Sequence, residues 1–201
     1  SGNTHWRNDL MINQIKLLWG DVPTKLEDFV SASQCVQAEA MKYFLEMWRS
    51  RKFADKTGMI WWNLRDGWPV VSDAVVDYYN SKKLAYFYLR NTERDVCVMM
   101  TDHLGDGLPL VAVNDTRRQV QGNVKVSDLG SGRKVFSASF TVPRNGRTVV
   151  TSLPKPSGQG VYLIEYEIDG RKYKNHYLYG DPPFDFSRYK SLMSKSGIYG
   201  F

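Results

Sequence analysis

The sequence is poor in the residues that build metal centres. It contains 2 Cys and 3 His among 201 residues. The three histidines, His5, His103 and His176, lie far apart, and no His-x-x-x-His or Cys-x-x-Cys spacing occurs. We therefore expect no metal site and no cofactor.

Two cysteines are also too few for a disulfide framework. Cys35 falls in a predicted helix and Cys97 in a predicted strand. A bridge between them is possible by count, but no spacing supports it, and two isolated buried thiols are the favoured interpretation.

Long apolar runs and long basic runs are both missing. No stretch approaches the roughly 18 apolar residues that a membrane span needs, so we expect no membrane partner. The polar residues 1–5 do not form a signal peptide. The formal net charge is +6, yet no run of Lys and Arg reaches five, so we expect no nucleic-acid partner.

Aromatic residues are abundant, with 6 Trp and 12 Tyr. In the first half of the chain, apolar spacing predicts helices over residues 8–19, 24–51 and 81–90. Thr24 and Glu27 have the spacing of a capping box.

The second of these helices is expected to bend near residues 31–33. Glu39 and Glu46 lie seven positions apart on one side of it, a spacing that could suggest an acid/base pair. A solvated helix face is the simpler explanation.

A short strand with a polar end is predicted over Gly58–Pro69. Its apolar run is followed by hydrogen-bonding and stacking groups, and Pro69 ends the ladder. Ligands bind at the carboxyl ends of strands in parallel α/β folds. The alternative is a core strand followed by an ordinary polar loop.

From Asp95 onward the apolar period changes to two. Seven short alternating segments, separated by turn residues, predict an immunoglobulin-like antiparallel sandwich. Asp169-Gly170 is a strong signal for a hairpin turn between the last two strands.

The predicted strand resembles the last barrel strand of glycoside hydrolase family 2, in its β-mannosidase-like and exo-glucosaminidase-like branch. The family pattern is aromatic-Trp-Gln-Leu-Asn-Asp-x-Trp-Pro, with Arg65 here in place of the usual Asn and Asn63 in place of Gln. The matching residues are Trp61, Trp62, Leu64, Asp66, Trp68 and Pro69, followed by Ser72 and Asp77-Tyr78-Tyr79.

This resemblance implies an α+β fragment: helices and one strand from the end of a TIM-type barrel, followed by the immunoglobulin-like sandwich. Residues 1–92 would be the C-terminal remnant of a (β/α)8 barrel, residues 93–180 the sandwich, and residues 181–201 an extended basic tail. It also implies contacts with a sugar. The implied substrate-binding residues are Trp62, Asn63, Asp66 and Trp68.

The implied activity is retaining hydrolysis of a β-glycoside, β-mannoside or a related sugar, by two Glu residues. In the family these lie in Asn-Glu and Ser-Glu segments, and this sequence contains neither dipeptide. We therefore predict that the chain alone is inactive and carries no catalytic residue. Glu165 and Glu167 share a strand face, but a solvent-facing stripe explains that pair better.

The resemblance further suggests a secreted, periplasmic or lysosomal enzyme, and uncovered helix faces that could self-associate. Two other functions stay open, a carbohydrate-binding sandwich and a purely structural module. A binding sandwich would need an exposed aromatic row, for which Tyr162, Tyr166 and Tyr173 are candidates.

Overall fold

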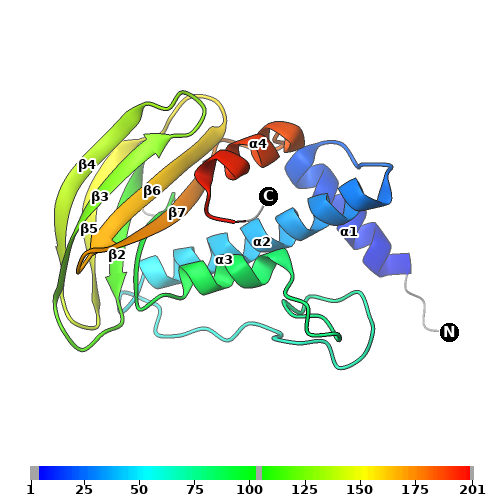
Figure 1. The fold of residues 1–201 in the computed structure, drawn as a ribbon, viewed down its shortest axis with the longest axis horizontal. Helices are drawn as coiled ribbons and strands as arrows, with labels where there is room; N and C mark the ends of the chain where they lie inside the picture. The colour runs from blue at the N-terminus through cyan, green and yellow to red at the C-terminus, as the bar shows by residue number, and fades with distance from the viewer. Residues whose placement is uncertain (1–4, 103–105, 200–201) are drawn as a thin grey trace.

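The computed structural model describes residues 5–102 and 106–199, in which a layer of helices packs beside a two-sheet β-sandwich (Figure 1). The helices are α1 (His5–Trp19), α2 (Leu26–Ser50), α3 (Leu84–Thr92) and α4 (Phe186–Ser196). The strands are β1 (Val96–Met100), β2 (Gly107–Asn114), β3 (Val120–Asp128), β4 (Lys134–Val142), β5 (Gly146–Pro154), β6 (Gly160–Ile168) and β7 (Arg171–Tyr179). No helix within these described residues is long and apolar enough to cross a membrane.

The seven strands form two antiparallel sheets. One has the order β1-β2-β5 and the other the order β4-β3-β6-β7. The chain therefore crosses between the sheets after β2, after β4 and after β5, as in sandwiches of the immunoglobulin type. The prediction of an antiparallel arrangement of seven strands is confirmed.

The β6–β7 hairpin is built as its turn sequence indicates. Asp169 and Gly170 have φ angles of 50° and 73°, the left-handed region that a two-residue turn with matching twist requires. The register around the turn pairs Ile168 with Arg171.

Alternating residues from both sheets fill the space between them. Removing these side chains from water is the main stabilising term for such a sandwich, at about 25 cal/mol per Å² of apolar surface. The most deeply buried members are Val98, Leu110, Ala112, Val126, Val142 and Ile164, each 0% exposed.

The outer face of the β1-β2 pair is buried as well. Cys97, Met99, Val111 and Val113 point away from the sandwich interior and are all 0% exposed, and α2 packs against β1 and β2. Strands covered on both faces are apolar throughout, as the sequence of β2 shows. Both cysteines are buried free thiols, and burial raises the pKa of Cys35 to about 12.

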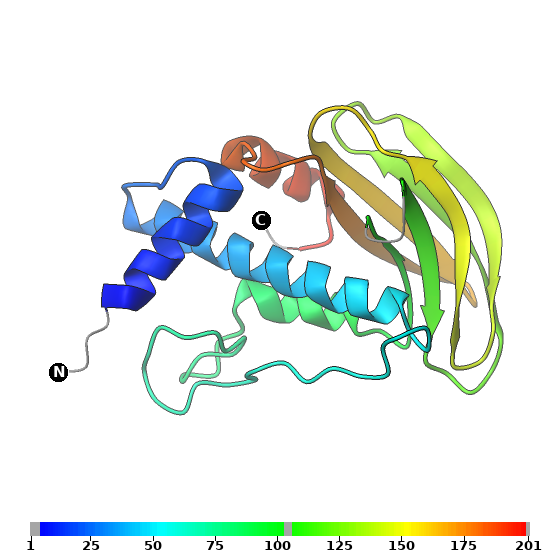
Figure 2. The same cartoon turned by 180° about the vertical axis from the view of Figure 1, so that it is seen from behind.

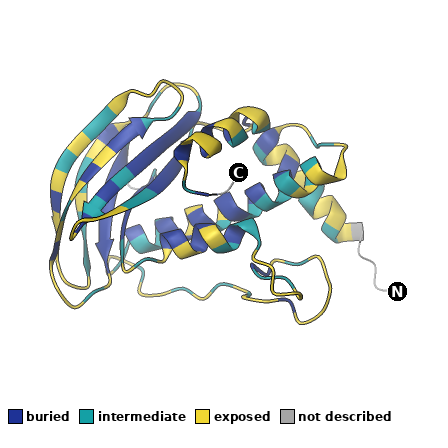
Figure 3. Cartoon of the chain, viewed as in Figure 1, coloured by how far each residue is buried: buried dark blue, intermediate teal, exposed yellow. Residues whose placement is uncertain are grey.

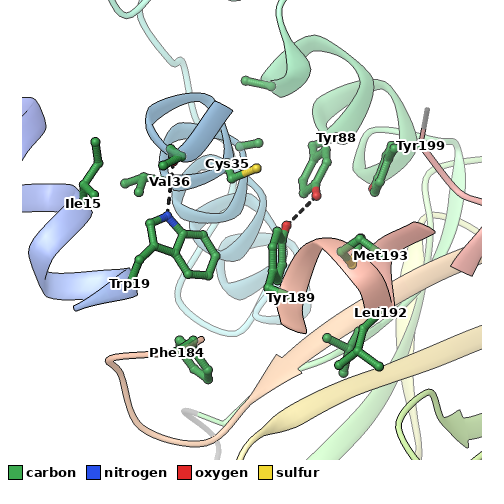
Figure 4. Packing of buried hydrophobic residues seen from close by; sticks show 14 of the residues in the cluster. Ile15, Trp19, Cys35, Val36, Tyr88, Phe184, Tyr189, Leu192, Met193 and Tyr199 are labelled. Carbon is green, nitrogen blue, oxygen red and sulfur yellow. Dashed lines mark hydrogen bonds between the residues drawn. The ribbon is translucent and has the colours of Figure 1, made fainter. Parts of the chain in front are cut away.

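The helices have a core of their own, centred on Trp19 at the end of α1 (Figure 4). Its ring lies 4.7 Å from that of Tyr189 and 5.0 Å from that of Phe186, between ring centroids. Its Nε1 donates to the Ala32 carbonyl oxygen of α2 at 3.2 Å. One tryptophan thus joins α1, α2 and α4.

Two details predicted for α2 are wrong. The helix begins at Leu26 with Lys25 in the N-cap position, and no side chain caps it. It also runs without a bend through residues 31–33, because Ala32 and Cys35 are buried by neighbouring elements and packing outweighs the weak helix preference of serine.

The predicted extended tail is also wrong for residues 186–196, which form α4. The Asp185 side chain accepts a hydrogen bond from the Arg188 backbone N–H at 2.8 Å, and Gly197 ends the helix with φ 61°. An Asp N-cap and a glycine C-cap are ordinary helix signals. Burial of Tyr189, Leu192 and Met193 supplies the packing.

The strand predicted over residues 58–69 does not form. Residues 51–83 are an irregular segment that runs along the helices (Figure 2). Within residues 58–69, only Arg65 makes an isolated bridge, to Val76. A parallel strand is stable only beside other strands, and the described chain places none next to this one.

Candidate functional site

The irregular segment that carries the predicted sugar-binding residues is fixed to the helices by side-chain hydrogen bonds. Trp48 Nε1 donates to the Gly58 carbonyl at 2.9 Å, and Gln37 Nε2 donates to the Asp73 carbonyl at 2.7 Å. Arg7 donates to the Val71 carbonyl at 2.9 Å. The segment lacks regular structure but has a defined path.

Asp66 holds this segment together from within. It is 4% exposed; Ser72 Oγ donates to one carboxylate oxygen, and Lys83 Nζ lies 3.2 Å from the other. Its backbone N–H donates to the Val76 carbonyl at 3.1 Å. Both oxygens therefore have partners inside the protein, so the geometry gives Asp66 a positioning role, and contact with a ligand stays a prediction.

The two adjacent tryptophans point in different directions. Trp61 is half-buried, packs on the helical core, and donates from Nε1 to Glu93 Oε1 at 3.0 Å. Trp62 is 82% exposed. The peptide bond between Trp62 and Asn63 is cis, and the Asn63 carbonyl accepts from Val75 N–H at 3.3 Å.

Arg65, which replaces the family's Asn, is used within the segment. Its Nη2 donates to the Tyr78 carbonyl oxygen at 3.1 Å. The guanidinium is therefore bound to the backbone of the same irregular segment, twelve to thirteen positions further along the chain than Asp66 and Arg65.

Several large apolar side chains on this segment face solvent (Figure 3). Such a concentration within one short segment is uncommon on a soluble domain and indicates an interaction surface. We call it the exposed row: Ile60, Trp62, Leu64, Trp68, Val71 and Tyr79, which are 98%, 82%, 60%, 67%, 61% and 72% exposed. Of the predicted site residues, the structure therefore exposes Trp62 and Trp68, half-buries Asn63 and buries Asp66.

A second group of chemically active side chains lies where the helices meet β7, and no sequence motif predicts that these residues come together. Glu39 accepts from Tyr189 Oη at 2.5 Å and lies 2.7 Å from His176 Nε2, while Tyr88 and Tyr189 share a 2.7 Å hydrogen bond. We call this group the α2–β7 junction. The prediction that Glu39 lies on a solvated helix face is wrong, because α2 is covered by β7 and α4.

Glu46 is likewise buried, 3% exposed, in the same junction. Lys42 Nζ lies 2.6 Å from one of its oxygens, and Asn175 Nδ2 donates to the other at 2.7 Å. Charges buried this deeply are tolerated only when paired and hydrogen-bonded. The partners of both Glu39 and Glu46 are protein groups. We therefore interpret the junction as a structural contact between the helices and the sandwich and not as an open binding site.

The electrostatics of Glu39 follow from this pairing. Burial alone raises the pKa of its carboxyl group, but the charge and hydrogen bond of His176, the charge of Lys42 and the hydrogen bond from Tyr189 together lower the pKa below its ordinary value. Glu39 is thus held as a carboxylate in the folded protein.

The remaining candidates are ordinary surface or core residues. Glu165 Oε2 lies 3.1 Å from Lys125 Nζ in a half-exposed ion pair, and Glu167 is opposite Lys172 in the sheet. Tyr162 and Tyr166 are buried in the sandwich, and Tyr173 stacks on Tyr166 at 5.3 Å between ring centroids. These tyrosines therefore do not form an exposed row on the sheet.

Comparison with known proteins finds similarity to parts of β-mannosidases. The β-mannosidase B of Thermothelomyces thermophilus is 27% identical over 198 residues, which is 80% of this chain and 23% of that protein. The β-mannosidase B of Aspergillus niger is 37% identical over 78 residues, 37% of this chain and 9% of that protein. No family model matches the chain.

Two solved structures share the fold. A β-D-mannosidase from Dictyoglomus thermophilum superposes with a TM-score of 0.74 at 22% identity, covering 86% of this chain and 22% of that chain. The exo-chitosanase CsxA of Amycolatopsis orientalis superposes with a TM-score of 0.68 at 21% identity, covering 83% of this chain and 21% of that chain.

Helices packed beside an antiparallel sandwich are therefore shared with part of each of these enzymes. The resemblance to glycoside hydrolase family 2 is confirmed, and the chain corresponds to a part of its β-mannosidase-like members. It spans less than a quarter of the first relatives it matches.

Proposed function

We propose that this chain is the sugar-pocket edge and C-terminal sandwich of a retaining β-glycosidase, with a β-mannoside or a related β-glycoside as substrate. The observation that supports this most directly is Trp62, 82% exposed on a segment that Asp66, Ser72 and Lys83 hold in place. An exposed, fixed indole ring is suited to stack on the apolar face of a sugar.

The rest of the barrel would supply what the chain lacks. Residues 1–92 would then be the last part of a (β/α)8 barrel, and residues 58–69 would become a strand only when a neighbouring strand is present. The exposed row would lie against that neighbour or around the sugar. Both catalytic carboxylates would come from outside these 201 residues.

An exchange of the matching part tests the proposal. We would replace the aligned residues of the Thermothelomyces thermophilus β-mannosidase B with this chain and measure hydrolysis of an aryl β-mannoside. Retained turnover by a soluble chimera supports the proposal. A folded, monodisperse chimera without turnover would contradict it, and the unaltered enzyme is the control.

The isolated chain provides the complementary measurement. We expect no turnover of aryl β-mannosides, β-glucosaminides or β-galactosides, because neither catalytic Glu segment is present. Turnover that survives purification and is lost in Glu165→Gln or Glu167→Gln would assign catalysis to the strand pair instead.

The exposed row makes a further prediction about assembly. Apolar side chains left uncovered favour self-association, so we expect concentration-dependent dimers or larger species of the isolated chain in sedimentation. Replacing Ile60 and Leu64 by Ser should shift the chain toward monomer. A monomer at all concentrations would show that the row tolerates solvent unaided.

The structural-module alternative keeps one supporting observation. The α2–β7 junction joins the helices to the sandwich through buried, paired charges, as a bracing domain would need. If the chimera retained activity when Trp62 and Trp68 were both replaced by Ala, bracing would be the better description.

A further inference from the structure

A cavity of about 720 Å³ lies on another part of the molecule, between α3, β7 and the segment that follows α4. Its volume is within the roughly 300–1,000 Å³ typical of small-molecule sites. None of the residues of the exposed row lines it. It is therefore separate from the sugar-binding edge proposed above.

The cavity wall is strongly basic. Four cationic side chains line it and, in the described part of the chain, no Asp or Glu does: the cations are Arg90, Arg94, Lys172 and Lys174. The C-termini of α3 and α4 both lie at this cavity, and each contributes a negative charge of only about half a unit against the four cations. The cavity therefore keeps a large positive potential.

These cations are positioned without being neutralised. The Arg94 guanidinium lies 4.9 Å from the centre of the Tyr173 ring, and that of Arg90 lies 5.8 Å from the centre of the Phe87 ring. A ring face orients a guanidinium without using up all of its five N–H donors, and although Arg94 also hydrogen-bonds the Tyr166 side chain, donors remain to bind an anion. Among the described residues, no ion pair includes any of the four cations.

The two lysines are held by the sheet. Lys174 Nζ donates to the Ser196 carbonyl at 2.9 Å, at the end of α4, which still leaves two of its donors. On the neighbouring strand, Glu165 and Glu167 are opposite Lys174 and Lys172. Glu165 is already paired with Lys125 at 3.1 Å, so it does not cancel the charge of Lys174.

Two further lining residues, Asn91 and Tyr199, are held in place by their neighbours. Asn91 is buried and donates to the Lys174 carbonyl at 3.0 Å, and the Tyr199 ring stacks on Tyr88 with centroids 3.9 Å apart. Four directed cations beside these two residues suit a compact oxyanion carried on a larger body, because arginine binds phosphate and carboxylate through two parallel hydrogen bonds.

We propose that this cavity, the basic cavity, binds a small molecule bearing a phosphate, sulfate or carboxylate group. The proposal does not depend on the glycosidase assignment, because the exposed row and the basic cavity share no residue. A glycosidase part with such a cavity would respond to an anionic sugar or metabolite at a site away from the reacting sugar.

Calorimetry on the 201-residue chain at low salt tests the proposal. The probes are inorganic phosphate, glucose 6-phosphate and glucuronate, with glucose as the neutral control. We expect saturable binding of at least one anion and none of glucose, and the anion that binds most tightly identifies the charged group. No saturable binding of any of the three anions would overturn the proposal.

Matched variants separate a site from general positive charge. Arg90→Gln and Lys172→Gln change exposed side chains, so the fold should survive, and each should weaken binding by ten-fold or more. Arg144→Gln removes one exposed charge in the β4–β5 turn, outside the cavity wall, and should leave the affinity unchanged. Equal weakening by all three variants would mean non-specific attraction and would overturn the proposal.

Discussion

The α2–β7 junction and the exposed row differ both in chemistry and in surroundings: polar side chains are buried in the first, and apolar side chains are exposed in the second. The junction gathers Glu39, His176 and Tyr189, residue types common in active sites, yet each is buried and bonded to protein groups. The row gathers Trp62 and Trp68, which are exposed and have no cover in the described chain. The comparison teaches that accessibility, and not residue type, separates a candidate site from a structural joint.

The largest expected effect on stability comes from a substitution that disrupts the α2–β7 junction. Glu39→Ala removes the partner of His176 and Tyr189 and leaves buried polar groups unpaired, so we expect a loss of roughly 3–5 kcal/mol in the free energy of unfolding. Chemical denaturation measures it. Glu165→Ala, which removes a half-exposed ion pair, is the control and should cost at most about 1 kcal/mol. Similar losses for the two variants would contradict the structural role.

The next effect concerns the row and is catalytic. In the chimeric enzyme, Trp62→Ala should lower kcat/KM by roughly two to three orders of magnitude, about 3–4 kcal/mol, because stacking contact strengthens as the sugar ring flattens in the transition state. Trp61→Phe loses the hydrogen bond to Glu93 and should lower the melting temperature more than turnover. If Trp61→Phe lowered kcat/KM and Trp62→Ala lowered only the melting temperature, the assignment of Trp62 to the sugar-facing side of the segment would be wrong.

The junction should also respond to acid, more weakly than to mutation. The pKa of Glu39 is lower in the folded protein than its ordinary value of 4.5, so its stabilising contribution is complete above that pH and is lost as the pH falls through the folded pKa. Denaturation midpoints between pH 7 and pH 3 measure this. Glu39→Gln should flatten the acid limb, and an unchanged limb would contradict the assignment.

The smallest effect compares one side chain from each kind of environment. Ile15 is 0% exposed in the helical core, and Ile15→Val should lower the free energy of unfolding by about 1 kcal/mol. Leu64, 60% exposed in the row, should change stability by at most about 0.5 kcal/mol when changed to Ala, although more atoms are removed. Thermal melting of the two variants checks the order. A greater loss for Leu64→Ala would show hidden cover over the row.

Elements set by local pattern could be predicted from the sequence, and elements set by distant partners could not. The seven strands and the turn at Asp169-Gly170 follow from alternation and turn chemistry. The burial of Glu39 depends on His176, 137 positions away, for which the sequence has no signal. The strand expected over residues 58–69 has the composition of a barrel strand, but composition does not supply the neighbouring strand that pairing requires.

The site shows the same division. The motif predicted Trp62 as a sugar-binding residue; its ring is exposed in the structure, while the Trp61 ring packs on the helices, and the contact of Trp62 with a sugar stays a prediction. The motif also predicted Asp66 among the sugar contacts. In the structure the Asp66 carboxylate is instead hydrogen-bonded to Ser72 and Lys83, which follow it in the sequence. Local spacing indicates which residues gather, and only three-dimensional packing decides which of them remain free. The sequence contains the N-cap and C-cap signals of α4 at Asp185 and Gly197. The helix was not predicted because the segment between them is basic and lacks a clear apolar period.

The contacts of the N-terminal helices with α4 determine the order in which parts of the chain can fold during synthesis on the ribosome. Glu39 of α2 and Tyr189 of α4 are 150 positions apart. Trp19 of α1 also packs against Tyr189, so it cannot complete its contacts before α4 has been synthesised. At 5–20 residues per second, roughly 8 to 30 seconds separate the synthesis of these partners. During that interval α1 and α2 are without their closing helix, while the strands of the sandwich emerge and pair among themselves. We therefore expect the nascent chain to complete its sandwich first and its older, N-terminal helices last.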